Sequence, residues 1–284
     1  MPKILLWLRA ALPWSGLIVL SACSLVAPPS DDAQALRTAV TSALREPANR
    51  ARDPARHPFE TLQSFELRPD QNVIEIAPGA GWYTEILAPF LRERGHLAVA
   101  LYVDEAPVPT QNDAKFAAAH QRFEAKFATH PDRYGTITVG ELRAGVLTGV
   151  GPAGSADAVL TFRNIHNWIA SGHFDATLSA FYAVLKPGGV LGVEEHRAAP
   201  GTTLEQIVAS GYVPEAYVVE HARAAGFVLV SRSEVNANPR DTKDHPNGVW
   251  SLPPTLRGGD AGREHFVAIG ESDRMTLTLR KPLH

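Results

Sequence analysis

Two histidines and a glutamate follow apolar segments of the chain and could transfer protons. His166 comes shortly after an apolar run at residues 156–162, and Glu195 and His196 end a second run that begins at residue 190. An imidazole titrates near neutral pH, and a neighbouring carboxylate can orient it or stabilise its charge. His166, His196 and Glu195 are therefore the candidate catalytic residues. The alternative interpretation is that the two histidines only form hydrogen bonds with loops.

A metal site would be another use of the histidine side chains. His166 and His173 lie in a segment that also contains Trp and Gly, and their spacing matches no common pattern of metal ligands. Cys23 is the only cysteine in the chain, so we expect neither a thiolate zinc site nor a disulfide framework. The sequence therefore predicts no metal ion.

A glycine turn follows a third apolar run, at residues 73–76, and precedes a segment with helical spacing at residues 86–91. Glycines let a ligand approach the backbone, and the unpaired N–H groups of a helix N-terminus suit an anionic group. The turn lacks the lysine of a phosphate-binding P-loop, and Thr84 stands where a dinucleotide-binding turn needs its third glycine. An acidic residue and two glycines remain, in the segment from Glu75 to Gly81. A turn without a ligand is the alternative.

This segment resembles motif I of the class I S-adenosylmethionine-dependent methyltransferases, although the family commonly has a further glycine where this chain has Ala77. The resemblance implies that S-adenosylmethionine is the cofactor. It assigns cofactor binding to Glu75, Pro78, Gly79, Gly81, Asp104 and Asn164. Asp104 follows the expected second strand, at residues 97–103, where an acidic residue accepts hydrogen bonds from a ribose. A plain loop acid is the alternative at this position.

Longer segments narrow the resemblance. LKPGGVL at residues 185–191 is frequent in class I methyltransferases, whereas RNIHNW at residues 163–168 and EEHRA at residues 194–198 are far more particular. From about Asp53 onwards the chain is similar to a group of bacterial predicted methyltransferases, including lipoproteins, and the resemblance names no substrate. Methyl transfer depends mainly on holding the acceptor in line with the methyl group, and a base helps only when the acceptor is protonated.

Strand and helix patterns alternate along the chain. Apolar runs predict strands at residues 73–76, 97–103, 156–162, 190–194, 227–230 and 275–279. Helical spacing predicts a first helix from Asp31 or Asp32 and further helices at residues 112–130 and 214–225. The alternation predicts an α/β fold with a doubly wound, Rossmann-like and mostly parallel sheet. The resemblance adds an antiparallel last strand, and the first helix forms an N-terminal helical extension.

The first residues have the features of a bacterial lipoprotein signal peptide. Lys3 and Arg9 provide positive charge, residues 10–19 are largely apolar, and the segment LSAC ends at Cys23. The apolar stretch is shorter than the roughly 20 residues that a membrane-spanning helix needs. We expect cleavage before Cys23 and lipid attachment to it, and Ser24 favours the outer membrane over the inner one. An incidental cysteine after an ordinary signal peptide is the alternative.

The expected organisation is a signal peptide at residues 1–22, a tether and helical extension at 23–66 and a methyltransferase-like domain at 67–284. The net charge is −3 and charges of both signs are interspersed, so no nucleic-acid partner is expected. The expected partners are an unknown small-molecule or envelope substrate and the membrane, on the periplasmic side. S-adenosylmethionine is made in the cytoplasm, which conflicts with export. Two functions therefore stay open: a lipid-anchored methyltransferase, and a binding or structural lipoprotein that keeps the fold without turnover.

Overall fold

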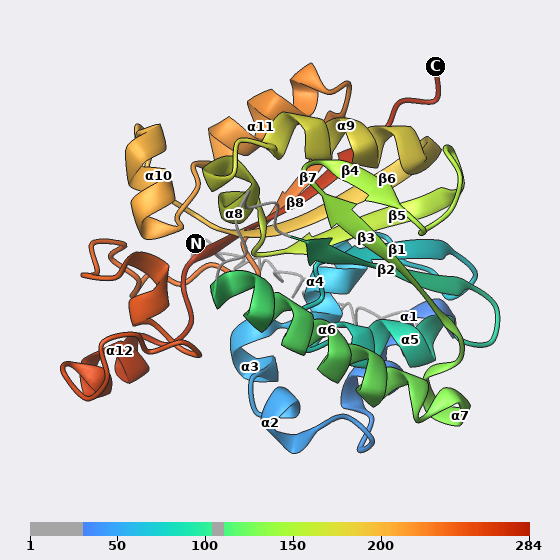
Figure 1. The fold of residues 1–284 in the computed structure, drawn as a ribbon, viewed down its shortest axis with the longest axis horizontal. Coiled ribbons are helices and arrows are strands. Elements are labelled where there is room, and N and C mark those ends of the chain that lie inside the picture. Colours follow the sequence, from blue (N-terminus) through green and yellow to red (C-terminus); the bar gives the residue numbers. More distant parts are fainter. Residues whose placement is uncertain (1–30, 104–110) are drawn as a thin grey trace, which may run out of the picture.

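A computed structural model describes residues 31–103 and 111–284 of the chain (Figure 1). Two residues singled out in the sequence, Cys23 and Asp104, lie outside the described residues. The described part is built on an eight-stranded sheet with the order β4-β3-β2-β1-β5-β6-β8-β7. The strands are β1 (Asn72–Ile76), β2 (His96–Val103), β3 (Ile137–Arg143), β4 (Val146–Thr148), β5 (Ala156–Phe162), β6 (Leu185–His196), β7 (Val228–Ser233) and β8 (Arg274–Arg280).

Strand pairing is parallel through the middle of the sheet and antiparallel at both sides. β1 pairs in parallel with β2 and β5, and β5 pairs in parallel with β6. β8 is antiparallel to both of its neighbours, and β4 is antiparallel to β3. The predicted α/β class, the mostly parallel sheet and the antiparallel last strand are thus confirmed. Because the strand order reverses between β1 and β5, their carboxyl ends border the crevice where such sheets bind ligands.

Helices cover both faces of the sheet (Figure 1). On one face α8 (Ile165–Ala170), α9 (Phe174–Val184) and α11 (Glu215–Ala224) share a buried apolar cluster with the strands. On the other face the cluster includes α1 (Asp31–Thr41), α4 (Pro58–Ser64), α5 (Thr84–Leu91) and α6 (Gln111–Ala128). The remaining helices are α2 (Pro47–Arg50), α3 (Asp53–Arg56), α7 (Pro131–Tyr134), α10 (Leu204–Ser210), α12 (Arg263–Ile269) and the 3-10 helix η1 (Gly248–Ser251).

The central strands are apolar on both sides because helices enclose them. In β1, Val73 belongs to one cluster, whereas Ile74 and Ile76 belong to the other, as the two-residue period of a strand requires. Glu75 lies between the two isoleucines and is only 1% exposed. A carboxyl group is thereby built into the core next to the ligand-binding edge of the sheet.

Some local predictions differ from the structure. The RNIHNW segment, where no helix was predicted, contains α8, whose Ile165, Trp168 and Ile169 are buried against the core. β6 begins at Leu185, earlier than the predicted start at residue 190, and has an irregular register at its beginning. The short elements β4, α2 and α3 were not predicted, since three or four residues carry too little periodicity to be recognised.

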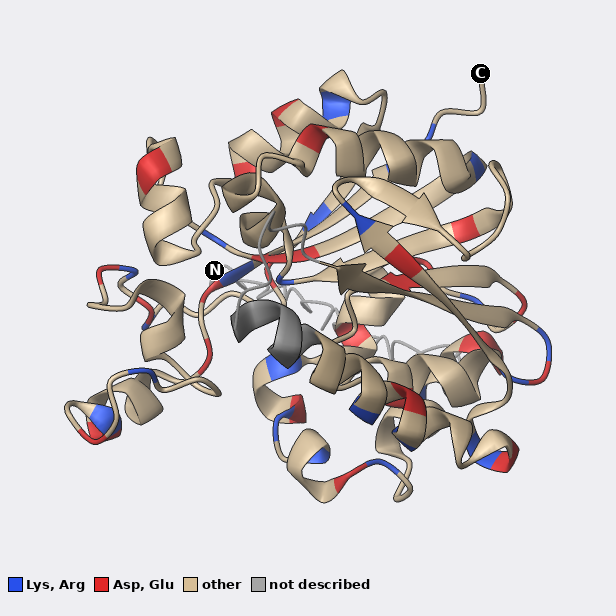
Figure 2. Ribbon diagram, viewed as in Figure 1, with Lys and Arg blue, Asp and Glu red and all other residues tan. Residues whose placement is uncertain are grey.

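Basic and acidic residues are interspersed over the helices, strands and loops (Figure 2). Within residues 31–103 and 111–284, no helix has both the length and the apolar character needed to cross a membrane.

Candidate functional site

A cavity of about 520 Å³ lies at the carboxyl ends of β1, β5 and β6. Its volume falls in the range of small-molecule sites. It is enclosed by the N-terminal helices, the glycine turn after β1, the RNIHNW segment after β5, the residues before β8 and the segment around η1. The polar residues that line it are Asn49, Arg52, Arg56, Glu75, Tyr83, Arg163, Asn164, His166, Asn167, His196, Thr255, Glu271 and Ser272.

The two glycines of the turn have different roles. Gly79 lines the cavity with a φ of +59°, and a Cβ atom added there would meet no atom within 4 Å. Its bare backbone therefore borders open space that a side chain would fill. At Gly81, where φ is +78°, an added Cβ would lie 2.4 Å from the ring of Phe127. Gly81 does not line the cavity, and it allows α6 to pack against the turn instead.

Ala77 adopts a left-handed backbone conformation, with a φ of +47°. It stands where motif I commonly has glycine, the residue that adopts this conformation without strain. Alanine in this conformation costs about 1 kcal/mol more. Alanine in place of glycine therefore adds backbone strain, but it does not prevent the turn from forming.

A smaller cavity of about 140 Å³ adjoins the first, between the glycine turn, the end of β2 and α6. The two cavities share Ala77, Pro78, Gly79, Asn164 and Asn167. The amide nitrogen of Asn164 donates to the backbone oxygen of Ile76 at 3.1 Å, which fixes this side chain beside the turn. An elongated ligand could extend from one cavity into the other past Gly79.

Glu75 lines the larger cavity but is enclosed by the core. Burial raises the pKa of its carboxyl group to about 8, even though a hydrogen bond from Thr84 Oγ1, at 2.6 Å, favours the ionised form. The carboxyl group is therefore mostly protonated at neutral pH, and a cation bound nearby would favour its ionisation.

The structure brings His166 and Glu195 together. His166 Nδ1 lies 3.1 Å from Glu195 Oε1, and the carboxylate also accepts backbone N–H groups from Ile165 at 2.5 Å and His196 at 2.8 Å. These contacts hold the carboxylate in place and assign the proton of the imidazole to Nδ1. The Nε2 atom of His166 is then the nitrogen available to accept a proton.

The imidazole of His196 has a different environment. Its Nδ1 atom lies 2.6 Å from Ser272 Oγ, whereas Glu195 contacts only its backbone. Burial, reinforced by His166, Arg163 and other cationic neighbours, places the pKa of His196 well below its ordinary value. His196 is therefore neutral at neutral pH and is a weak base. Of the two histidines considered as bases, His166 is the one whose imidazole ring a carboxylate orients.

A metal ion would be another possible occupant of this group. In the described part of the chain, ligand atoms of His166, Glu195 and His196 lie within 4.8 Å of one another. However, both carboxylate oxygens of Glu195 already accept hydrogen bonds, and arginines lie close by. The contacts therefore favour a hydrogen-bonded group over a cation site. His173, the other histidine considered for a metal pair, stands at the N-cap of α9.

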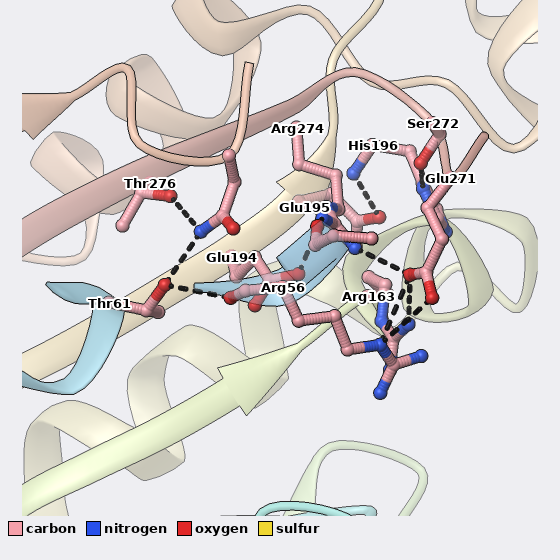
Figure 3. A network of polar contacts seen from close by, with 12 residues as sticks. Arg56, Thr61, Arg163, Glu194, Glu195, His196, Glu271, Ser272, Arg274 and Thr276 are labelled. Atoms are coloured by element: carbon pink, nitrogen blue, oxygen red, sulfur yellow. Dashed lines mark hydrogen bonds and ion pairs between the residues drawn. The ribbon is translucent and has the colours of Figure 1, made fainter. Parts of the chain in front are cut away.

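An arginine cluster, formed by Arg52, Arg56, Arg163 and Arg274, surrounds Glu271. Figure 3 shows Arg56, Arg163 and Arg274 around this carboxylate. Burial alone would raise the pKa of Glu271, but the attraction of the four guanidinium groups outweighs it and lowers this pKa to about 2. Three of these arginines and Glu271 line the cavity. Sequence reasoning did not identify any of them as site residues.

Asn238 and Arg197 hold the residues around Glu271 in place. Asn238 donates from Nδ2 to the backbone oxygen of Glu271 at 2.7 Å and from its backbone to Asp273 at 3.0 Å. Arg197 of the EEHRA segment forms an ion pair with Asp273 at 2.9 Å. These contacts fix the approach to β8 and so position the carboxylate at the centre of the arginine cluster.

The predicted site residues that the structure describes mostly converge. The larger cavity is lined by six of them: Glu75, Pro78, Gly79, Asn164, His166 and His196. Glu195 does not line this cavity, but it contacts the imidazole of His166. Gly81 supports the turn, and Asp104 lies outside the described residues. The roles assigned to these residues remain predictions. Arg163, a charged residue directly after a buried strand, could have been recognised from the sequence, whereas Glu271 lies three residues before β8 and gives a weaker signal.

No protein-family model and no curated protein sequence matches the chain. Solved structures are similar in fold. A SAM-dependent methyltransferase from Aquifex aeolicus has a TM-score of 0.53 and 14% identity, over 88% of this chain and 98% of that one. An arsenic (III) S-adenosylmethionine methyltransferase from Chlamydomonas reinhardtii has a TM-score of 0.50 and 17% identity, over 90% and 74%. The [4+2]-cyclase SpnF has a TM-score of 0.54 and 20% identity, over 81% and 82%. The chain thus has the class I methyltransferase fold.

Proposed function

We propose that this protein is an S-adenosylmethionine-dependent methyltransferase that acts on a small-molecule or envelope substrate. The observation that carries the proposal is the pair of adjoining cavities that share Gly79 and Asn164 at the carboxyl ends of β1 and β5. Two neighbours in fold are described as S-adenosylmethionine methyltransferases, which supports the assignment. A third is a cyclase, so the fold alone does not specify methyl transfer.

The residues around the two cavities fit such a cofactor. S-adenosylmethionine supplies a methyl group bound to a sulfonium, which a nucleophile displaces in line. Gly79 offers bare backbone, and Asn164 offers an amide where the cavities meet. Glu75 provides a carboxyl group whose ionisation a nearby sulfonium or ammonium group would favour. Asp104 is retained as the proposed ribose ligand.

The proposed chemistry needs few groups from the chain. The cavity would hold the acceptor in line with the methyl group, and this positioning would provide most of the rate enhancement. For a protonated acceptor, His166 would take the proton at Nε2, while Glu195 keeps the ring oriented through Nδ1. His196 would act as a neutral hydrogen-bonding group beside the acceptor.

A binding or structural lipoprotein without turnover is the alternative. Ala77, the departure from motif I, would weakly favour it, but this residue is compatible with the turn. We also propose that Cys23 carries the lipid and that the domain faces the periplasm, with the outer membrane preferred over the inner one.

Calorimetric titration of the purified protein with S-adenosylmethionine and S-adenosylhomocysteine tests the proposal. We expect both to bind, and Gly79→Asn to weaken binding by about tenfold or more, or 1.4 kcal/mol. Asparagine tolerates left-handed backbone, so the added side chain rather than strain would cause the loss. Gly154→Asn is the matched control, because Gly154 has a φ of +67°, equally open surroundings and no place in either cavity.

Titration of the wild-type protein distinguishes the two proposed functions. Binding of neither compound would favour the lipoprotein without turnover, and binding of NAD in place of S-adenosylmethionine would show that the cofactor assignment is wrong. Equal weakening by Gly79→Asn and Gly154→Asn would remove Gly79 from the cofactor site.

A further inference from the structure

The wall of the larger cavity carries more positive than negative charge. Arg52, Arg56 and Arg163 line the cavity, together with two carboxyl groups. Glu75 is mostly protonated at neutral pH, because burial raises its pKa to about 8, whereas Glu271 is ionised. Three guanidinium groups therefore face one carboxylate.

Glu271 does not satisfy all the arginines around it. Its oxygens lie 2.8 Å from Arg52 Nε, 2.8 Å from Arg274 Nη1 and 3.1 Å from Arg56 Nε. Arg163 comes no closer than 3.6 Å, beyond hydrogen-bonding distance. Figure 3 shows the guanidinium groups of Arg56 and Arg163 converging on this carboxylate. Among the described residues, the buried Arg163 Nε has no hydrogen-bond partner.

The backbone of Arg163 is also unusual. Its φ is +61°, a left-handed conformation that costs a residue other than glycine about 1 kcal/mol. Backbone strain of this kind persists where the surrounding structure requires a side chain in one position, and it is frequent at ligand sites. Burial, followed by repulsion from Arg163, lowers the pKa of Arg56 to about 9. The carboxylates of Glu271 and Glu194 raise this pKa, but they do not offset burial and the repulsion from Arg163 and Arg52.

We infer that Arg163, together with Arg56 and Arg52, binds an anionic oxygen group, a carboxylate or a phosphate, on the methyl acceptor. This inference rests on the proposed function. The planar guanidinium group pairs with either kind of anion through two parallel hydrogen bonds. The cofactor is a weaker candidate for this anion, because its sulfonium and ammonium groups outnumber its one carboxylate.

Thermal unfolding in increasing concentrations of inorganic phosphate or of acetate, at constant ionic strength, tests the inference with the full-length protein. Each anion that binds the folded state raises the melting temperature in a concentration-dependent manner, from which its Kd follows. We expect Arg163→Gln to raise the Kd of the preferred anion about tenfold or more, because the variant loses charge-assisted hydrogen bonds to the anion. Arg143→Gln is the matched control, since Arg143 is an exposed arginine on β3 that pairs with Glu141.

A second variant should strengthen anion binding, whereas Arg163→Gln should weaken it. Glu271→Gln removes the carboxylate that competes for the arginines, so we expect it to lower the Kd for the anion by a few-fold. A stronger response to phosphate than to acetate would identify a phosphate group on the acceptor, and the reverse would identify a carboxylate.

Three results have distinct meanings. Equal anion responses of the wild-type, Arg163→Gln and Arg143→Gln proteins would overturn the inference. A tenfold loss of S-adenosylmethionine binding in Arg163→Gln, with an unchanged phosphate response, would also overturn it, because the arginine would then bind the cofactor. An anion response that depends on Arg163 in a protein that binds no S-adenosylmethionine would support the anion site and reject the methyltransferase assignment.

Discussion

At the scale of single residues, Glu75 couples the ionisation of one carboxyl group to the stability of the fold. In the folded protein its pKa is raised to about 8 from an ordinary value of 4.5. Between these two pH values the unfolded chain releases the proton and the folded chain keeps it. The free energy of unfolding therefore falls as the pH rises, by up to about 1.4 kcal/mol per pH unit, and this loss is complete above the folded pKa.

Glu75→Gln should remove this dependence, because glutamine accepts the hydrogen bond from Thr84 and does not ionise. We expect the variant to gain stability relative to the wild-type protein as the pH rises from 4.5 to 8, with no further gain above that. Denaturant unfolding at several pH values measures the difference. Identical pH profiles of the two proteins would mean that Glu75 is already ionised in the unliganded fold.

Individual site residues could be predicted from the sequence when they follow a recognisable strand. His166 and His196 come after apolar runs, and parallel strands bring their carboxyl ends to one edge, so their proximity followed from the topology. Arg52 and Arg56 could not be found in this way. Arg52 precedes the short helix α3 and Arg56 ends it. The sequence around these residues has no hydrophobic periodicity that would indicate which edge of the sheet this segment covers.

At the scale of elements, Gly81 determines how closely α6 approaches the glycine turn. Gly81→Ala would place a methyl group 2.4 Å from the ring of Phe127 and would strain the left-handed backbone. We expect the free energy of unfolding to fall by roughly 2 to 5 kcal/mol, the sum of overpacking and backbone strain. Chemical denaturation monitored by circular dichroism measures this loss.

Gly154→Ala separates the two contributions. Gly154 has a similar positive φ but open space around its Cβ position, so this variant should lose only the backbone term of about 1 kcal/mol. If both variants lost the same stability, the contact with Phe127 would not be the reason for glycine at position 81.

Strands and helices could be predicted from the sequence where consecutive residues are buried. The run at residues 156–162 coincides with β5, because a strand covered on both faces is apolar throughout. α8 was missed because it is only six residues long and is buried through contacts with α9, α10 and the apolar cluster of the sheet. The long segment between β7 and β8 forms part of the cavity wall, yet it has no periodic pattern from which its position could be predicted.

At the scale of the whole molecule, the proposed lipid anchor decides where the site operates. Cys23→Ser should abolish incorporation of radiolabelled fatty acid and release the protein from the membrane fraction of the cell. Ser24→Asp is the matched variant, which should keep the label and retain the protein in the inner membrane. Wild-type protein without label would remove the envelope assignment, and the conflict with a cytoplasmic cofactor would disappear with it.

The ion pairs between the N-terminal helices and the approach to β8 also determine when the cavity forms. Arg52 and Arg56 bind a carboxylate that lies 219 and 215 positions further along the chain. A ribosome releases the N-terminal arginines first, so the cavity is completed only after nearly the entire polypeptide has been synthesised. A chain that a signal peptide directs through a membrane in unfolded form would cross without this pocket. It would then meet its small molecules only in the compartment where folding ends.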